Sequence, residues 1–515
     1  MPGLSVPRVA GYRVRPLVSP LQMSGLAILC LAGVVWGVSA IRGQSSLPVW
    51  QYSLMLGIYG VASAVFVIPR VKVNSSQLFD LPVFITLTTF LQFGLIPLYF
   101  LLHPQLRLHG YLTDPGLLTR ALFYFVLGMV AFWAGSSYMR SHEGVAASTE
   151  SGGPARAGLL KDDEVLLWLG AIYLPAVAVR IYLLHSHLYS YTESFALYFQ
   201  KLAVMQVLLV VTQFGPFALV LAAVETYWHP HDAKRSLLFY LVFTSECFWG
   251  LISGMKLFTI ENFVLVALVS SLVLRRIRVR WMVAPLLVLV LIYPFNNQYR
   301  NLIRGAGLEV TSLNSAVGVA SLAFTNALER TQSLTDWFGT GADSTLERLD
   351  LLQGVATFVN LGSWADPLRT RDQWWLLPIY SFIPRLLWSS KPQEDMGQKL
   401  SVMLHEDPNS CTSPTYPGDA YLEFGVGGVM VCMLLLGIFT QWMSRLGSGT
   451  LSKRRLFVFA SLFLTVADLE NDFFSYWTGA IRALVILSVI AWLVYRRTPV
   501  PRSVRTRVSV PCGKP

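Results

Sequence analysis

Long apolar runs separated by short polar segments dominate this chain. Runs of about 20 residues can cross the ~30 Å hydrocarbon core of a bilayer as helices. Backbone in lipid must satisfy its own hydrogen bonds, which favours helices over open strands. We therefore predict an all-α polytopic integral membrane protein with about 12 transmembrane helices. The predicted spans are about 22–41, 50–68, 80–102, 116–138, 164–184, 198–224, 236–255, 257–274, 281–296, 424–443, 456–470 and 480–495.

The longest polar interruption separates the ninth predicted helix from the tenth. It divides the chain into a nine-helix transmembrane region, a large loop, a three-helix transmembrane region and a disordered tail. Their predicted bounds are 1–296, 297–421, 422–497 and 498–515. Within the loop, Ser315–Leu334 carries apolar residues at helical spacing and is predicted to be a helix. The aromatic stretch Trp374–Trp388 is broken by two prolines and is typical of a segment at the membrane interface.

Composition and charge agree with this pattern. Of the 515 residues, 54% are hydrophobic and 13% are charged, which excludes an ordinary soluble protein of this size. More than half of the 40 lysines and arginines lie in alternate inter-helix segments and at the two ends. The positive-inside rule makes these segments cytoplasmic. Both termini are therefore predicted to be cytoplasmic and the large loop extracytoplasmic, and the net charge of +11 needs no nucleic-acid partner.

Cations in and near the large loop are the first candidates for chemistry. Arg300 and Arg304 follow the ninth span and share one helical face. Two guanidinium groups at the membrane surface suit a diphosphate, and anchoring to lipid headgroups is the alternative. Arg385 and Lys391 flank a Trp-Ser-Ser turn, and Lys256 closes a tight turn between spans seven and eight. A second cation pair on the same face favours a polyanionic ligand, whereas the alternative is a solvated loop.

Three residues are candidates for a general base. Asp419 and Glu423 are four residues apart at the start of span ten, so they lie on one face if that stretch is helical. Either carboxylate can accept a proton from a sugar hydroxyl, and capping of the helix N-terminus is the alternative. His405 precedes two acids in the loop, where a base or a solvated loop is expected, and no metal site is predicted. Asp419 is favoured because the preceding Pro-Gly holds it in a turn.

Two acids lie inside predicted spans seven and eight. Glu246 and Glu261 are placed within the membrane, where acids are costly and usually face a cavity. Pairing of such an acid with Lys256 is the structural alternative to a functional site.

A further acidic group ends span eleven on the predicted outer face. It contains Asp468, Glu470 and Asp472. We expect these acids to form a salt bridge with Arg300 or Arg304.

Four segments carry a resemblance to a known family. They read SGMK (Ser253–Lys256), NQYRNLIRG (Asn297–Gly305), IPRLLWSSKP (Ile383–Pro392, followed by Gly397) and TSPTYPGDAYLEFGVGG (Thr412–Gly428). In order and spacing they are similar to the oligosaccharide repeat-unit polymerases, the O-antigen polymerases of Wzy type. Asp419 stands where a glutamate is expected and Lys256 where an arginine is common, and both changes keep the charge.

The resemblance implies a glycosyltransferase of the bacterial inner membrane. Such an enzyme moves a growing glycan from undecaprenyl pyrophosphate onto a new lipid-linked repeat at the outer face. The implied partners are undecaprenyl-pyrophosphate-linked glycans, membrane lipid, a chain-length regulator and a flippase. The cations would hold the pyrophosphate, and neither a metal nor another cofactor is implied.

Two other functions fit the same pattern. An O-antigen ligase uses the same donor with a different acceptor. A lipid-linked oligosaccharide transporter or ion-coupled transporter is favoured by Glu246 and Glu261. The chain has no GxxxxGK[ST] loop for ATP, so energy must come from the substrate or from a gradient.

Overall fold

The computed structural model contains only helices as regular elements within the residues that it describes. These residues are 49–71, 75–104, 112, 114–141, 162–189, 202–274, 279–330, 333–370, 376, 379–380, 383, 387–388, 391, 396–405, 411–447 and 452–495. Nine described helices are long and apolar enough to cross a membrane. They are Val49–Val71, Leu81–Leu102, Pro115–Ser141, Glu164–His185, Val204–Trp228, Ala233–Ile252, Leu257–Leu274, Tyr416–Gly447 and Phe473–Val494. The prediction of a helical membrane protein is confirmed.

Several of these spans contain more than one element or extend slightly beyond the apolar stretch. The elements are α2 (Val49–Val71), α3 (Leu81–Thr89), η2 (Phe90–Leu95), α4 (Ile96–Leu102), α5 (Pro115–Ser141), α7 (Asp162–His185), α9 (Leu202–Thr212), α10 (Phe214–Trp228), α11 (Ala233–Ile252), α12 (Lys256–Leu274), α19 (Tyr416–Gly447) and α21 (Phe473–Val494). The predicted spans 281–296 and 456–470 are also helical, as α13 (Val279–Arg300) and α20 (Lys453–Ala467). The predicted span 22–41 lies outside the described residues.

The helices pack around two main apolar cores. One core joins α2, α5, α19 and a short helix, α16 (Leu352–Leu361), and the other joins α10, α12, α20 and α21. Helices α5 and α19 approach closely through glycine. A Cβ at Gly135 would lie 2.3 Å from Leu434 O, and one at Gly437 would lie 2.1 Å from Phe132 O. Small residues allow such contact between helices in a membrane, where dispersion between backbones stabilises the pair.

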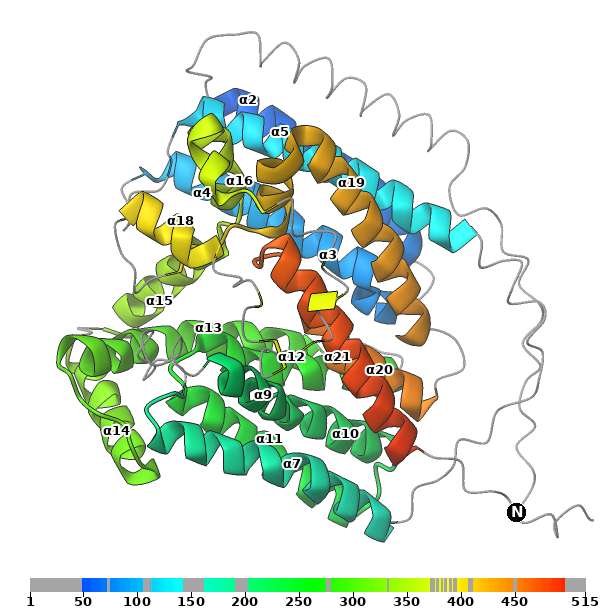
Figure 1. Cartoon of the computed structure of the whole chain (residues 1–515), viewed down its shortest axis with the longest axis vertical. Coiled ribbons are helices and arrows are strands. Elements are labelled where there is room, and N and C mark those ends of the chain that lie inside the picture. Colours follow the sequence, from blue (N-terminus) through cyan, green and yellow to red (C-terminus); the bar gives the residue numbers. More distant parts are fainter. Residues whose placement is uncertain are drawn as a thin grey trace, which may run out of the picture.

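The elements of the large predicted loop gather at one end of the bundle. They are η5 (Asn301–Gly305), α14 (Leu313–Arg330), α15 (Leu334–Leu349), α16, η6 (Gly362–Leu368) and α18 (Met396–His405). In Figure 1, α14, α15, α16 and α18 lie along the left side of the molecule. The predicted helix Ser315–Leu334 is confirmed as α14, although it ends at Arg330 and Leu334 begins α15.

Three predicted boundaries were wrong by several residues. Helix α19 begins at Tyr416 rather than near residue 424, so the end of the predicted loop at 421 is already helical. The helix is kinked within its third turn, where Gly425 has φ +64°. Helix α21 begins at Phe473 rather than near residue 480, because the Asp472 side chain accepts a hydrogen bond from Ser475 N at 2.7 Å and caps the helix. Helix α13 continues to Arg300 and takes that arginine out of the predicted loop.

Candidate functional site

A polar cavity of about 810 Å³ lies at the end of the bundle where the loop elements gather. We call it the outer cavity, after the side of the membrane on which the distribution of lysine and arginine predicts it to lie. It is bordered by α15, α16, α18 and the segment 411–415, which has no regular structure. Its polar lining consists of Glu347, Arg348, Asp350, Gln353, Thr357, Asn360, His405, Cys411, Thr412, Ser413 and Thr415. A volume of this size lies within the range of small-molecule sites.

One wall of the outer cavity contains a strained residue, Thr415, packed against a glycine, Gly354. Thr415 has φ +60°, a left-handed conformation that β-branched residues rarely adopt. Its Oγ1 accepts a hydrogen bond from Gly418 N at 3.2 Å. A Cβ at Gly354 on α16 would lie 2.6 Å from Thr415 Cγ2. The missing side chain lets the turn before α19 press against α16, and backbone strain of this kind concentrates at functional sites.

Charged groups of the outer cavity are held by partners from distant parts of the chain. Arg348 forms an ion pair with Glu470, which lies between α20 and α21. Gln353 Nε2 donates to Asp350 Oδ2 at 3.2 Å, and Gln353 Oε1 accepts from Leu112 N at 3.1 Å. His405 is the last residue of α18 and is exposed to the cavity.

The acidic group 468–472 has partners that the sequence did not indicate. We predicted that it would meet Arg300 or Arg304. In the described part of the chain, Glu470 forms an ion pair with Arg348 on α15, and Asp472 caps α21. The pair forms because the loop elements fold back over the bundle and bring α15 to this corner. A contact with Arg304 stays a prediction, since its side chain lies outside the described residues. Arg348 is therefore a cavity residue that sequence reasoning did not assign.

Asp419 and Glu423 lie in the first turns of α19 and do not line the outer cavity. Asp419 is 1% exposed, and its Oδ2 accepts a hydrogen bond from Phe473 N at 2.9 Å. Its Oδ1 has no hydrogen-bond partner among the described residues. Glu423 accepts hydrogen bonds from Thr370 Oγ1, at 3.0 Å, and from Thr370 N. The two carboxylates thus tie α19 to α21 and to the segment after η6.

The structure describes only part of the predicted cation set. Arg300 Nε donates to Gly254 O at 3.1 Å, and Nη2 lies 4.0 Å from Met255 Sδ. This contact brings together two of the segments that carry the family resemblance. The side chains of Lys256 and Arg304, and the whole of Arg385, lie outside the described residues.

Lys391 has a different environment from the solvated or ligand-facing cation that we predicted. It is 4% exposed, and its Nζ donates to Tyr380 O at 2.6 Å and to Ile383 O at 3.4 Å. The ammonium group also lies 5.7 Å from the centre of the Tyr380 ring. These contacts show that Lys391 holds its own segment together, and its predicted role toward pyrophosphate stays a prediction.

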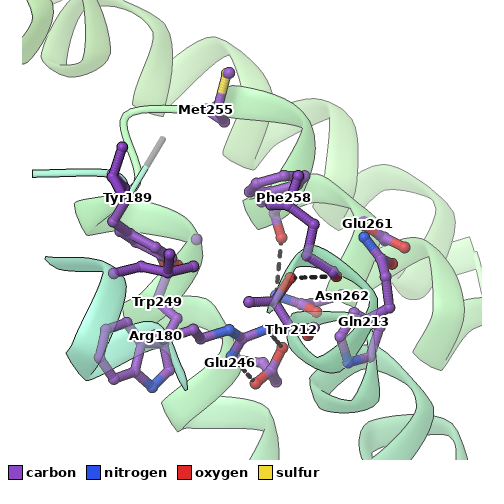
Figure 2. Close-up of a pocket in the computed structure, with 15 residues that line it drawn as sticks. Arg180, Tyr189, Thr212, Gln213, Glu246, Trp249, Met255, Phe258, Glu261 and Asn262 are labelled. Carbon is purple, nitrogen blue, oxygen red and sulfur yellow. Dashed lines mark hydrogen bonds and ion pairs between the residues drawn. The ribbon is translucent and has the colours of Figure 1, made fainter. Parts of the chain in front are cut away.

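A second pocket, of about 120 Å³, lies among α7, α9, α10, α11 and α12 (Figure 2). We call it the buried pocket. At its base, Arg180 forms a two-pronged ion pair with Glu246, with Nη2 2.9 Å from Oε2. We had considered Lys256 as the structural partner of this acid. Arg180 holds that place because α7 and α11 both pack against α10, where Gly215 leaves room for the two side chains to meet.

The sequence Gly215-Pro216 makes room for this ion pair. Proline has no N–H, so residue 216 cannot bond the carbonyl of Thr212 one turn earlier. Arg180 Nη2 donates to that carbonyl instead, at 3.2 Å. A Cβ at Gly215 would lie 2.4 Å from Arg180 Nη2 and 2.7 Å from the Glu246 carboxylate. A Gly-Pro pair inside an apolar span was the sequence signal for this site.

Together these features define a helical membrane protein with a polar cavity at one end and a small polar pocket among its spans. The chain belongs to a family defined by a domain of unknown function, DUF8712, whose match covers residues 172–448, more than half of the chain. The matched range includes Arg180, Glu246, Arg300, His405 and Asp419. No curated protein and no solved structure matches the chain.

Proposed function

We propose that this protein is a membrane glycosyltransferase. It polymerises undecaprenyl-pyrophosphate-linked repeat units into O-antigen or exopolysaccharide at the outer face of the bacterial inner membrane. The resemblance of the four quoted segments suggests the reaction. The observation that carries the proposal is the outer cavity, which offers about 810 Å³ lined by hydroxyl, amide and charged side chains. Such groups suit the hydroxyls of a sugar.

The reaction needs a base and an electrophile that lie close together. A hydroxyl of the acceptor sugar attacks C1 of the donor sugar, and the bond from C1 to the pyrophosphate oxygen breaks. The electron pair leaves with the lipid pyrophosphate, and the hydroxyl proton passes to the base. Of the three predicted bases, His405 lines the outer cavity, so we assign this role to His405.

The leaving pyrophosphate requires positive charge. Arg300 is positioned against the 253–255 turn by its bond to Gly254 O. Arg304 follows in the same segment, and Arg385 lies in the loop. In this proposal they stabilise the charge that develops on the leaving group, the role that a metal ion has in other transferases.

The test uses a strain that lacks the gene and carries the protein or its variants on a plasmid. We expect His405→Ala to shorten the glycan to single repeats at normal protein level, because a positioned base contributes about 10²- to 10⁴-fold. His103→Ala is the matched control, since His103 is exposed at the end of α4 and does not line the outer cavity. Long chains made by His405→Ala would overturn the assignment of the base.

The gene deletion itself tests the reaction class. A polymerase leaves a single repeat on lipid A when it is lost, and a ligase leaves none. A transporter is the second candidate, favoured by the buried pocket with its intramembrane acids. Accumulation of unpolymerised repeats on the cytoplasmic side would support the transporter and overturn the glycosyltransferase.

A further inference from the structure

The charged groups that line the buried pocket do not balance. Its lining includes Arg180, Glu246 and Glu261. Arg180 donates to the Glu246 carboxylate from both Nη1 and Nη2, and Nη2 also donates to Thr212 O. Within the described part of the chain, Glu261 makes no hydrogen bond or ion pair. If Glu261 were ionised, the pocket would hold one uncompensated negative charge.

An uncompensated carboxylate within a membrane span is costly. Glu261 lies in the candidate span Leu257–Leu274, five residues after the start of α12. Lys256 is the nearest cation in the sequence. Its side chain lies outside the described residues, and no described cation pairs with Glu261. Lipid and apolar side chains offer no solvation, so such acids are neutral or have a cation beside them.

Two amides of the buried pocket add oxygen atoms near this carboxylate. Asn262 Nδ2 donates to Phe258 O at 3.0 Å. The side-chain oxygen of Asn262 can therefore act as a ligand for a cation. Gln213 lies between α9 and α10 and also lines the pocket. Figure 2 shows Glu261, Asn262 and Gln213 grouped on one side, away from the Arg180–Glu246 pair.

We propose that the buried pocket binds one monovalent cation, a proton or Na⁺, at Glu261. Carboxylate and amide oxygens are suitable for either ion, and the volume of about 120 Å³ leaves room for water beside it. The site goes beyond the proposed glycosyl transfer and does not depend on it. The pocket borders the turn 253–255 that contacts Arg300, since Met255 lines the pocket and also contacts that arginine.

The groups whose charge reaches Glu261 come from several elements. They are Glu246 on α11, Arg180 on α7 and Asp468 after α20. Two of these groups are acids, and the positive charge of Arg180 is already neutralised by Glu246. With Glu261 ionised, these four groups carry more negative than positive charge, which attracts a cation to the pocket.

The test is modification of the wild-type, full-length protein by dicyclohexylcarbodiimide in liposomes. This apolar reagent reacts with protonated carboxyl groups in membranes. Mass spectrometry of peptides then reports the modification at each acid as a function of pH, with NaCl compared with choline chloride. We expect modification of Glu261 to fall by about tenfold per pH unit once the carboxyl ionises. Glu246 is the internal control and should stay unmodified because of its ion pair with Arg180.

The outcomes separate the two ions. Modification that depends on pH but not on Na⁺ identifies a proton site, and protection by NaCl at fixed pH identifies a Na⁺ site. No modification of Glu261 at any pH, with or without Na⁺, would overturn the proposal. Glu261→Gln should remove the label from that peptide alone. None of these readouts requires glycan synthesis, so failure of the proposed function would leave them unchanged.

Discussion

At the residue scale, the two predicted bases Asp419 and His405 differ in their surroundings. Asp419 is buried and accepts a hydrogen bond from Phe473, the first residue of α21. The first N–H groups of a helix have no partner within it, so this carboxylate satisfies one of them from another helix. His405 is exposed in the outer cavity and is accessible to a ligand.

Substitutions of Asp419 test whether it is a helix cap. Asp419→Ala removes the carboxylate that accepts the hydrogen bond from Phe473 N, and we expect a loss of about 1–3 kcal/mol, measured as a lower Tm in detergent. Asp419→Asn keeps one carbonyl oxygen, so its loss should be smaller and long glycans should still form. Equal losses for both variants would contradict the capping role. A stable Asp419→Asn protein that makes no long chains would return the role of base to Asp419.

At the element scale, the contact between α16 and the turn before α19 forms a wall of the outer cavity. Gly354 and Thr415 meet there, and the left-handed backbone of Thr415 depends on this close approach. A larger residue at 354 must move the turn, because Pro414 O is also only 2.9 Å from the position of a Cβ.

Alanine at Gly354 tests this wall. We expect Gly354→Ala to lower stability by about 1–3 kcal/mol through overpacking and to shorten the glycan. Gly318→Ala is the matched control, since Gly318 lies in α14 with nothing within 4 Å of a Cβ. Alanine is favoured over glycine in a helix by about 1 kcal/mol, so the control should be neutral or more stable. If both variants behave alike, the wall has no special packing requirement.

A buried charge cluster joins α10, α11 and α20 at the other end of the bundle. Glu225 Oε2 accepts from Arg235 Nη1 and from Lys453 Nζ, both at 2.8 Å. Lys453 Nζ also lies 3.0 Å from His229 Nε2. An ammonium group only donates, so this nitrogen must be the acceptor, and the imidazole is neutral in the contact. Burial, together with Lys453 and Arg235, lowers the pKa of His229 below its ordinary value of 6.5.

This cluster predicts a loss of stability at low pH. Between the lowered folded pKa and 6.5, the unfolded chain binds the proton more readily than the folded protein. Stability from this group is therefore present above 6.5 and lost as the pH falls through the folded pKa. We expect Tm in detergent to fall on acidification, and His229→Gln to reduce that fall. His231→Gln, two residues further on, is the control. An unchanged pH profile in His229→Gln would refute the prediction.

At the scale of the whole molecule, α5, α19, α20 and α21 have the relative directions that the predicted topology requires. Tyr416 N donates to Leu469 O at 2.9 Å, which joins the start of α19 to the α20–α21 connection at one end. At the other end, Arg445 Nη2 on α19 donates to Met139 O on α5 at 2.6 Å. Which end faces the cytoplasm stays a prediction from the distribution of lysine and arginine.

Two native cysteines test that prediction. Cys411 lines the outer cavity, and Cys512 belongs to the predicted cytoplasmic tail, outside the described residues. In spheroplasts, a maleimide that cannot cross membranes should label wild type and Cys512→Ser but not Cys411→Ser. Burial raises the pKa of the Cys411 thiol, so labelling should quicken as the pH rises and thiolate forms. Labelling that survives Cys411→Ser and disappears in Cys512→Ser would reverse the topology.

The sequence by itself determined the class of protein and the approximate positions of its described helices. This was possible because the length and apolarity of a span are local properties set by the thickness of the bilayer. It also indicated α14 within the large loop, through helical spacing of apolar residues. The ends of helices were less predictable, because they depend on hydrogen bonds to other elements. Tyr416 and Asp419 lie in the first turn of α19 and form hydrogen bonds with Leu469 and Phe473, outside that helix.

Only the tertiary structure decided which charged groups meet. Arg180 pairs with Glu246, Arg348 with Glu470, and Asp419 with the backbone of Phe473. Each partner lies more than 50 residues away in the sequence, and each pair depends on which helices are adjacent and how each is rotated about its axis. The hydrophobic pattern shows that a span exists but does not show which helix packs beside it. An apolar side chain is nearly as stable against lipid as against another helix.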